Sequence, residues 1–202
     1  MNSEEVLKER RATDKMKRKI LSVFTAIIIL LASVTFISCS GKVSNEEAAA
    51  EVTRLVKESY ELNVIYFGKG LPYEDDGDDK SLYAPVAEDA AFTTKEELID
   101  KTRKVFSESN VTEMIEIAFQ GGSIGSTATY PRYITGSDGK LTVYKNIKGI
   151  ETEVNEYDYS TVSITRISKR FIKAKITSKA GNVVDVELVN QDGGWRINSR
   201  TY

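Results

Sequence analysis

The sequence predicts an α+β domain in which N-terminal helices pack on one face of a curved antiparallel β-sheet, after a cleaved signal segment. Apolar residues recur at helical spacing as far as Ala118, and from Tyr130 onward they recur at every second position. Helices repeat every 3.6 residues and strands every 2, so this order places helices first and a meander of strands after them. Segregation of that kind is typical of α+β folds.

Three helices are expected before the strands. The first runs from Glu46 to about Tyr66, and the second begins at Thr94, where Glu97 completes a capping box. The third starts at Asn110. We expect their buried stripes to be Val52, Leu55, Val56, Ser59 and Leu62, then Leu98, Ile99, Thr102, Val105 and Phe106, and finally Val111, Met114, Ile115 and Ala118.

The strand half predicts a hairpin centred on Ala180, because charge and hydrophobicity specify the same register. The expected pairs are Lys175 with Asp185, Lys173 with Glu187, Ile176 with Val184 and Ala174 with Val186. Asp192-Gly193 then favours a two-residue turn that brings Ile197 opposite Leu188. Trp195, on this last strand, is expected to be a core aromatic.

Cys39, the only cysteine, follows a pattern typical of export signals. Lys15, Lys17, Arg18 and Lys19 give a basic start, and Ile20–Phe36 is a run of 17 uncharged residues. Ser38 and Cys39 resemble the end of a bacterial lipoprotein signal, which implies cleavage before Cys39 and lipidation of its thiol. Phe36 departs from that pattern, in which leucine is usual.

The segment also has an alternative interpretation, an uncleaved membrane anchor with a cytoplasmic tail. Glu4, Glu5, Glu9 and Asp14 dilute the positive start, so the true start is suggested to be Met16. We expect 1–38 to be the signal peptide, 39–45 the lipidated cysteine and tether, and 46–202 a single domain. Either interpretation places that domain on the extracytoplasmic side of the cell membrane.

Composition narrows the function classes of the mature chain. Without the 7 basic and 4 acidic residues of 1–38, it holds 21 Lys+Arg and 26 Asp+Glu, a net charge of −5. This charge argues against nucleic acid as a partner. The chain has no histidine, which removes Ser-His and Cys-His catalysis and the commonest metal ligand. We therefore expect no enzyme activity, no cofactor and no bound metal, and a monomer.

The candidate partner-binding segment follows the first helix. It joins aromatic and apolar residues to five carboxylates around Gly77: Phe67, Leu71, Tyr73, Glu74, Asp75, Asp76, Asp78 and Asp79. An exposed loop of this composition can recognise a basic partner. The alternatives are a solvated loop, a Ca²⁺ site without EF-hand spacing, and packing of the aromatic residues against the sheet.

Tyrosines are frequent in the strand half and give a further candidate face. Tyr130, Tyr133, Tyr144, Tyr157 and Tyr159 permit a sugar- or peptide-binding surface there. Tyrosine is also an ordinary strand former, so the alternative is a structural role.

Two parts of the sequence resemble known protein families. The ending Val184-Asp-Val-Glu-Leu-Val-Asn-Gln-Asp-Gly-Gly-Trp-Arg-Ile197 looks like the last hairpin of nuclear transport factor 2-like and cystatin-like domains, which implies a fold rather than a function. The longer layout is similar to secreted Gram-positive proteins of the IseA type. It comprises the helix up to Tyr66-Phe67-Gly68, then Leu71-Pro72, Tyr83-x-Pro85-Val86, Thr94–Phe106 and the Gly-Trp hairpin.

The second resemblance implies a non-enzymatic inhibitor of cell-wall DL-endopeptidases, docking over a Cys-His peptidoglycan hydrolase. The alternative is a small-ligand or wall-binding module with a transport-factor-like cavity between helices and sheet. The expected partners are the membrane, through the lipid on Cys39, and a cell-wall endopeptidase.

Overall fold

A computed structural model describes residues 43–74, 77, 80–121, 123–124, 127–128, 130–146 and 152–202, all belonging to one compact unit. The predicted signal peptide, Cys39 and the tether as far as Lys42 lie outside the described residues. Within that described part, no helix is long and apolar enough to cross a bilayer.

The α+β class is confirmed, and the three helices form where the sequence places them. They are α2 (Asn45–Tyr66), α3 (Lys95–Val105) and α4 (Glu108–Gln120). Ser44 caps α2 and Thr94 caps α3, each through a complete capping box. Helix α4 begins two residues before the expected Asn110, and Ile115 on it is only half-buried.

A four-stranded antiparallel sheet closes the domain on one side. Its order is β6 (Tyr157–Ile167), β7 (Phe171–Ser178), β8 (Val183–Gln191) and β9 (Gly194–Ile197). The four predicted β7–β8 pairs and the pairing of Leu188 with Ile197 are confirmed. In the turn between β8 and β9, Asp192 and Gly193 both have positive φ, 51° and 77°, as a type I′ turn requires.

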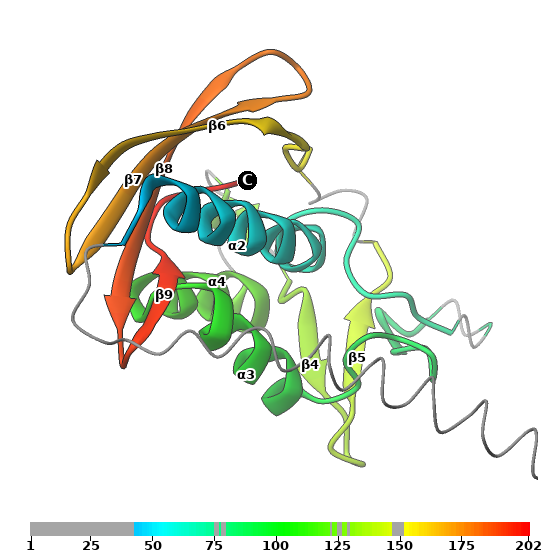
Figure 1. Cartoon of the computed structure of the whole chain (residues 1–202). Helices are drawn as coiled ribbons and strands as arrows, with labels where there is room; N and C mark the ends of the chain where they lie inside the picture. Colours follow the sequence, from blue (N-terminus) through cyan, green and yellow to red (C-terminus); the bar gives the residue numbers. More distant parts are fainter. Residues whose placement is uncertain are drawn as a thin grey trace, which may run out of the picture. The chain divides into compact units, whose positions relative to one another are not determined.

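The core lies between this sheet and the helices. Helix α2 runs across the inner face of the sheet, and α3 and α4 lie beside β9 (Figure 1). The side chains that fill this space are almost fully buried: Val52, Leu55, Val56, Leu98, Ile172, Ile176, Val186 and Leu188. Trp195 is half-buried and packs against the core. The interior is thus filled by side chains, as a stable domain requires.

A second, three-stranded sheet, the small sheet, corrects the expectation of a single sheet. Its order is β1 (Tyr83–Pro85), β5 (Leu141–Tyr144) and β4 (Tyr133–Thr135), all antiparallel. A short hairpin of β2 (Ser123–Ile124) and β3 (Thr127–Ala128) lies in the chain between α4 and β4. The strand at Tyr83–Pro85 could not be predicted from the sequence, because three residues show no period and a proline argues against a strand.

The small sheet is attached to the C-terminal end of α2 by hydrogen bonds. Buried Arg132 donates to the carbonyl oxygens of Gly68 and Phe67, at 2.6 and 3.1 Å. Both carbonyls lie directly after Tyr66, the last residue of α2, where the negative end of the helix dipole favours a cation such as a guanidinium. The end of α2 and the small sheet therefore form one rigid part of the domain.

Candidate functional site: the outer face of the small sheet

One face of the small sheet packs on the core and the other has no helix over it in the described residues. Side chains alternate between faces along a strand, and paired residues share a face. Ala84, Val143 and Tyr133 pair across the sheet and are fully buried. The opposite side, here called the outer face, carries Tyr83, Pro85, Ile134, Thr142 and Tyr144.

Aromatic contacts order this outer face. Tyr83 and Tyr144 are cross-strand partners with ring centroids 5.7 Å apart, and Tyr130 stacks on Tyr144 at 5.2 Å. Tyr130 itself remains 52% exposed, while its ring covers Tyr144, which is only 9% exposed. The Tyr83 hydroxyl donates to the carbonyl of Pro131 at 2.9 Å, which fixes the segment that carries Tyr130. The three rings thus form one supported aromatic surface.

Two further residues with exposed apolar side chains contact the backbone of Lys145 at the end of β5. The Lys145 N–H donates to the Leu82 carbonyl, and the Lys145 carbonyl accepts from the Tyr73 hydroxyl. Leu82 and Tyr73 are both exposed. By the alternation of side chains, however, Leu82 and Lys145 face away from Tyr83 and Tyr144, and Tyr73 shares the side of its partner Val86, so neither exposed side chain lies on the outer face.

The acidic segment starts at the edge of the small sheet. Tyr73 forms a bridge with Val86, and the Glu74 N–H donates to the Pro85 carbonyl at 2.9 Å. Glu74 is exposed beside an outer-face residue. Of the five predicted acidic residues, the structure describes only Glu74. The other four, Asp75, Asp76, Asp78 and Asp79, lie outside the described residues.

Two of the predicted contact residues are in the core, which corrects their assignment. Phe67 is 7% exposed and stacks on Tyr202 with centroids 3.7 Å apart, and Leu71 is 3% exposed. Gly70, at φ 78°, lets the chain turn back after α2, and the Tyr133 hydroxyl then accepts from the Leu71 N–H. Packing, the alternative considered for this segment, is correct for both residues, so a partner cannot reach them.

The tyrosines of the strand half divide between the outer face and other places. Tyr130 and Tyr144 lie on the aromatic surface, whereas Tyr133 and Tyr157 are buried in the core. Tyr159 is half-buried beside α2.

Burial, together with the neighbouring rings of Tyr144 and Tyr130, raises the pKa of Tyr83. Its phenol therefore stays neutral at any physiological pH, and the face can offer apolar contact and single hydroxyl hydrogen bonds.

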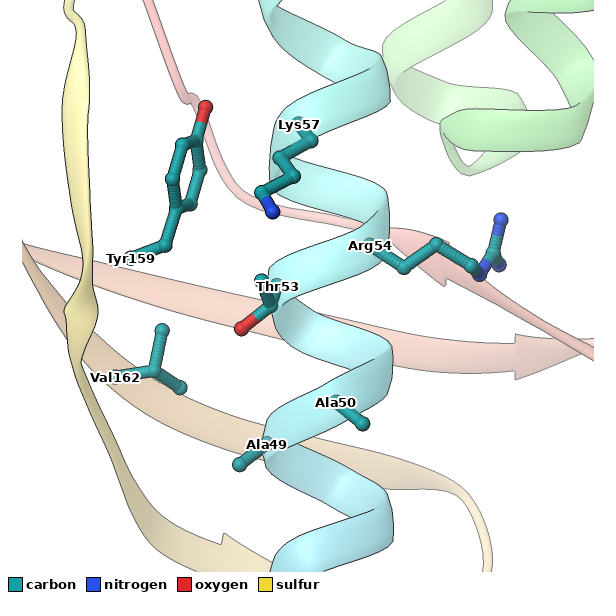
Figure 2. Close-up of a pocket in the computed structure, with 7 residues that line it drawn as sticks. All are labelled: Ala49, Ala50, Thr53, Arg54, Lys57, Tyr159 and Val162. Carbon is teal, nitrogen blue, oxygen red and sulfur yellow. The ribbon is translucent and has the colours of Figure 1, made fainter.

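A shallow groove of about 520 Å³ runs between α2 and β6 on the other side of the domain. Figure 2 shows small side chains on its helix side, with the Lys57 ammonium and the Tyr159 ring facing each other across it. The two lie 4.9 Å apart, a cation–π contact. The groove is open to solvent, and the space between α2 and the sheet beneath is packed. That packing disfavours the predicted ligand cavity between helices and sheet.

No group of three or more His, Cys, Asp or Glu side chains is placed to hold a metal ion among the described residues. No protein-family model matches the chain, and no curated protein is significantly similar to it. The candidate function therefore rests on the sequence pattern and on the surface described above.

Proposed function

We propose that this chain is a membrane-anchored extracytoplasmic lipoprotein that binds and inhibits a cell-wall hydrolase and is not itself an enzyme. The attachment part of the proposal comes from Cys39 and its signal, and the inhibitor part from the IseA-type layout. The observation that supports the docking part is the backbone pairing that holds exposed Tyr73 and Glu74 along the edge of the small sheet, against Val86 and Pro85.

The start of α2 and this edge lie at opposite ends of the helix. The chain enters α2 at Asn45, whereas Arg132 joins the small sheet to Phe67 and Gly68, directly after the helix. A helix of 22 residues is about 33 Å long at 1.5 Å per residue. The chain from Cys39 to Val43 adds at most ~14 Å. In a lipid-anchored protein, α2 then separates the docking edge from the anchored end of the domain.

Docking over a catalytic cleft would inhibit a hydrolase by excluding its substrate. An acidic edge favours a partner with a basic rim, because complementary charges accelerate encounter and orient the two surfaces. The net charge of −5 on the mature chain acts in the same direction. Inhibition of this kind needs no reactive group on the inhibitor.

The test is inhibition of purified DL-endopeptidases from the same organism by the mature domain, residues 40–202, with isolated cell walls as substrate. We expect dose-dependent loss of wall hydrolysis by at least one endopeptidase. A matched variant with Glu74, Asp75, Asp76, Asp78 and Asp79 changed to Asn or Gln should inhibit more weakly at low salt and show less dependence on salt. If the wild-type domain leaves every endopeptidase unaffected, the proposal is wrong.

A further inference from the structure

We infer that the groove between α2 and β6 binds a short peptide that ends in a free carboxylate beside small aliphatic side chains, the chemistry of cell-wall stem peptides. The Lys57 ammonium receives the carboxylate, and the aliphatic part lies along Ala49 and Val162. The choice of stem peptides rests on the proposed extracytoplasmic location. The site itself uses no residue of the small sheet and is independent of the inhibitor function.

Small side chains form the helix side of the groove. Ala49, Thr53 and Lys57 line it at intervals of four residues, so they share one face of α2. Figure 2 shows this face turned towards β6, with the Thr53 hydroxyl directed across the groove. Ala49 and Thr53 therefore leave room that larger side chains would fill.

The groove is long enough for only a few residues of extended chain. Ala49 and Lys57 lie eight positions apart on α2, a distance of about 12 Å at 1.5 Å per residue. An extended peptide advances by about 3.3 Å per residue, so roughly three or four residues fit. This length suits a short peptide better than the surface of a folded partner.

A bulge in β6 forms the opposite side of the groove. From Asp158 to Ser163 this strand advances by five residues, while β7 advances by two. In a regular strand Tyr159 and Val162 would point to opposite faces, but both line the groove. Bulges re-aim side chains in this way, and they are frequent beside binding sites.

Side-chain hydrogen bonds hold the bulge in shape. The Asp158 carboxylate accepts from the N–H and the hydroxyl of Ser160, at 3.0 and 2.6 Å. The Thr161 hydroxyl donates to the Asp158 carbonyl at 2.6 Å and accepts from the Thr177 N–H at 2.8 Å. The wall that carries Tyr159 is thus formed before a ligand binds, which lowers the entropic cost of binding.

Lys57 is the unpaired cation of the groove. Arg54 is bonded to Glu51 and Glu58, each at 2.6 Å, and Figure 2 shows it directed away from β6. Lys57 forms no ion pair among the described residues, although Glu61 lies one helical turn away. Its ammonium is held over the Tyr159 ring instead, which positions the charge without neutralising it. One ammonium matches the single charge of a carboxylate.

Sugars and phosphates fit this groove less well. A sugar stacks on an open ring face, but the Lys57 ammonium already occupies a face of Tyr159. A phosphate group favours free backbone N–H groups at a helix start. The groove instead runs along the side of α2, where these groups are bonded within the helix.

The experiment measures peptide binding to the full-length chain, purified in detergent, by fluorescence anisotropy. The probes are a labelled Gly-D-Ala-D-Ala peptide with a free carboxylate, its C-terminal amide, and the corresponding L-alanine peptide. We expect saturable binding of the first probe and at least about tenfold weaker binding of the amide. The inference is overturned by no saturable binding, by equal binding of acid and amide, or by tighter binding of the L-alanine peptide.

Two variants locate the site. Lys57→Gln removes the charge and Ala49→Leu fills the groove, and each should weaken binding by about tenfold. The matched control is Lys95→Gln, because the Lys95 ammonium also lies over a ring, that of Phe119, at 4.6 Å. This control should stay within about twofold of the wild type. Circular dichroism checks that all three variants fold, and wild-type affinity in folded Lys57→Gln would place the ligand elsewhere.

A wall-hydrolysis assay separates this inference from the proposed function. Lys57→Gln should inhibit an endopeptidase as strongly as the wild type, because the proposed docking edge is on the small sheet. Peptide binding without inhibition of any endopeptidase leaves the groove site standing and the inhibitor function wrong. Inhibition without peptide binding leaves the inhibitor function standing and this inference wrong.

Discussion

The hydroxyl oxygen of Tyr133 lies 2.8 Å from the carbonyl oxygen of Ile65, to which it donates a hydrogen bond. The same hydroxyl accepts from the Leu71 N–H at 3.0 Å. A single buried side chain on β4 therefore satisfies backbone groups on both sides of the turn that ends α2. Burial raises the pKa of Tyr133, so the hydroxyl keeps its proton and remains a donor. This bond helps to hold the small sheet in place at the end of the helix.

Removal of that hydroxyl should destabilise the domain. Tyr133→Phe leaves the Ile65 carbonyl and the Leu71 N–H unpaired in the interior, and each unpaired buried group costs about 1–3 kcal/mol. We expect a loss of about 2–4 kcal/mol in the free energy of unfolding, measured by urea denaturation. Tyr130→Phe, which removes an exposed hydroxyl, should cost less than about 0.5 kcal/mol. Equal stability of the two variants would contradict the role of Tyr133.

The turn between β8 and β9 should tolerate asparagine but not alanine. Gly193 has φ 77°, and a Cβ there costs about 1–2 kcal/mol although the space around it is open. Gly193→Ala should lower the melting temperature, as followed by circular dichroism. Asp192→Asn at the preceding position should be nearly neutral, because asparagine accepts positive φ. An unchanged melting temperature for Gly193→Ala would exclude a type I′ turn.

Acid should weaken the contact between α2 and α3. Burial works to raise the pKa of Glu58, but the hydrogen bond and charge of Lys101, together with Arg54, outweigh it and the pKa is lowered. Folding thus favours the ionised form of Glu58. Its contribution to the free energy of unfolding is fully present above the usual pKa of 4.5 and is lost as the pH falls through the lowered pKa.

A Glu58→Gln variant tests this contact. Glu58 and its basic partners Arg54 and Lys101 are partly exposed. We therefore expect the variant to lose only about 0.5–1 kcal/mol of unfolding free energy at pH 7. The loss should shrink as pH falls through the lowered pKa of Glu58, because the wild-type carboxylate is then protonated as well. Unfolding curves at several pH values measure it, with exposed Glu61→Gln on the same helix as the control. A loss that is constant across this range would show that charge is not the cause.

Cys39 should carry the membrane attachment. Cys39→Ser removes the thiol that a lipid would acylate, so metabolic labelling with an alkyne fatty acid should label the wild-type chain only. Ser40→Thr, on the other side of Cys39 and outside the signal pattern, keeps the thiol and should remain labelled. Labelling that persists in the Cys39→Ser variant would disprove attachment at this residue.

The hairpin of the large sheet could be predicted residue by residue. Lys173 and Lys175 face Glu187 and Asp185, as the sequence analysis expects, because the strands are long and their turn is short. Alternation and opposite charges then specify one register. The helices were predictable for a similar reason, since Ser44 and Thr94 supply local caps that need no distant partner.

The outer face could not be predicted in the same way. Tyr83 and Tyr144 become neighbours only through pairing of two short strands far apart in sequence. The burial of Phe67 likewise depends on stacking against Tyr202, a residue far from it in the sequence. Local composition identifies an aromatic and acidic segment, but only these long-range contacts decide which members face outward.

Hydrogen–deuterium exchange of the mature domain, with and without an endopeptidase that it inhibits, tests most directly where the partner docks. We expect slower exchange in β1, β4 and β5 and in the segments that carry Tyr73 and Tyr130, with no change along the groove between α2 and β6. Protection centred on that groove or on the large sheet, with the small sheet unchanged, would contradict it.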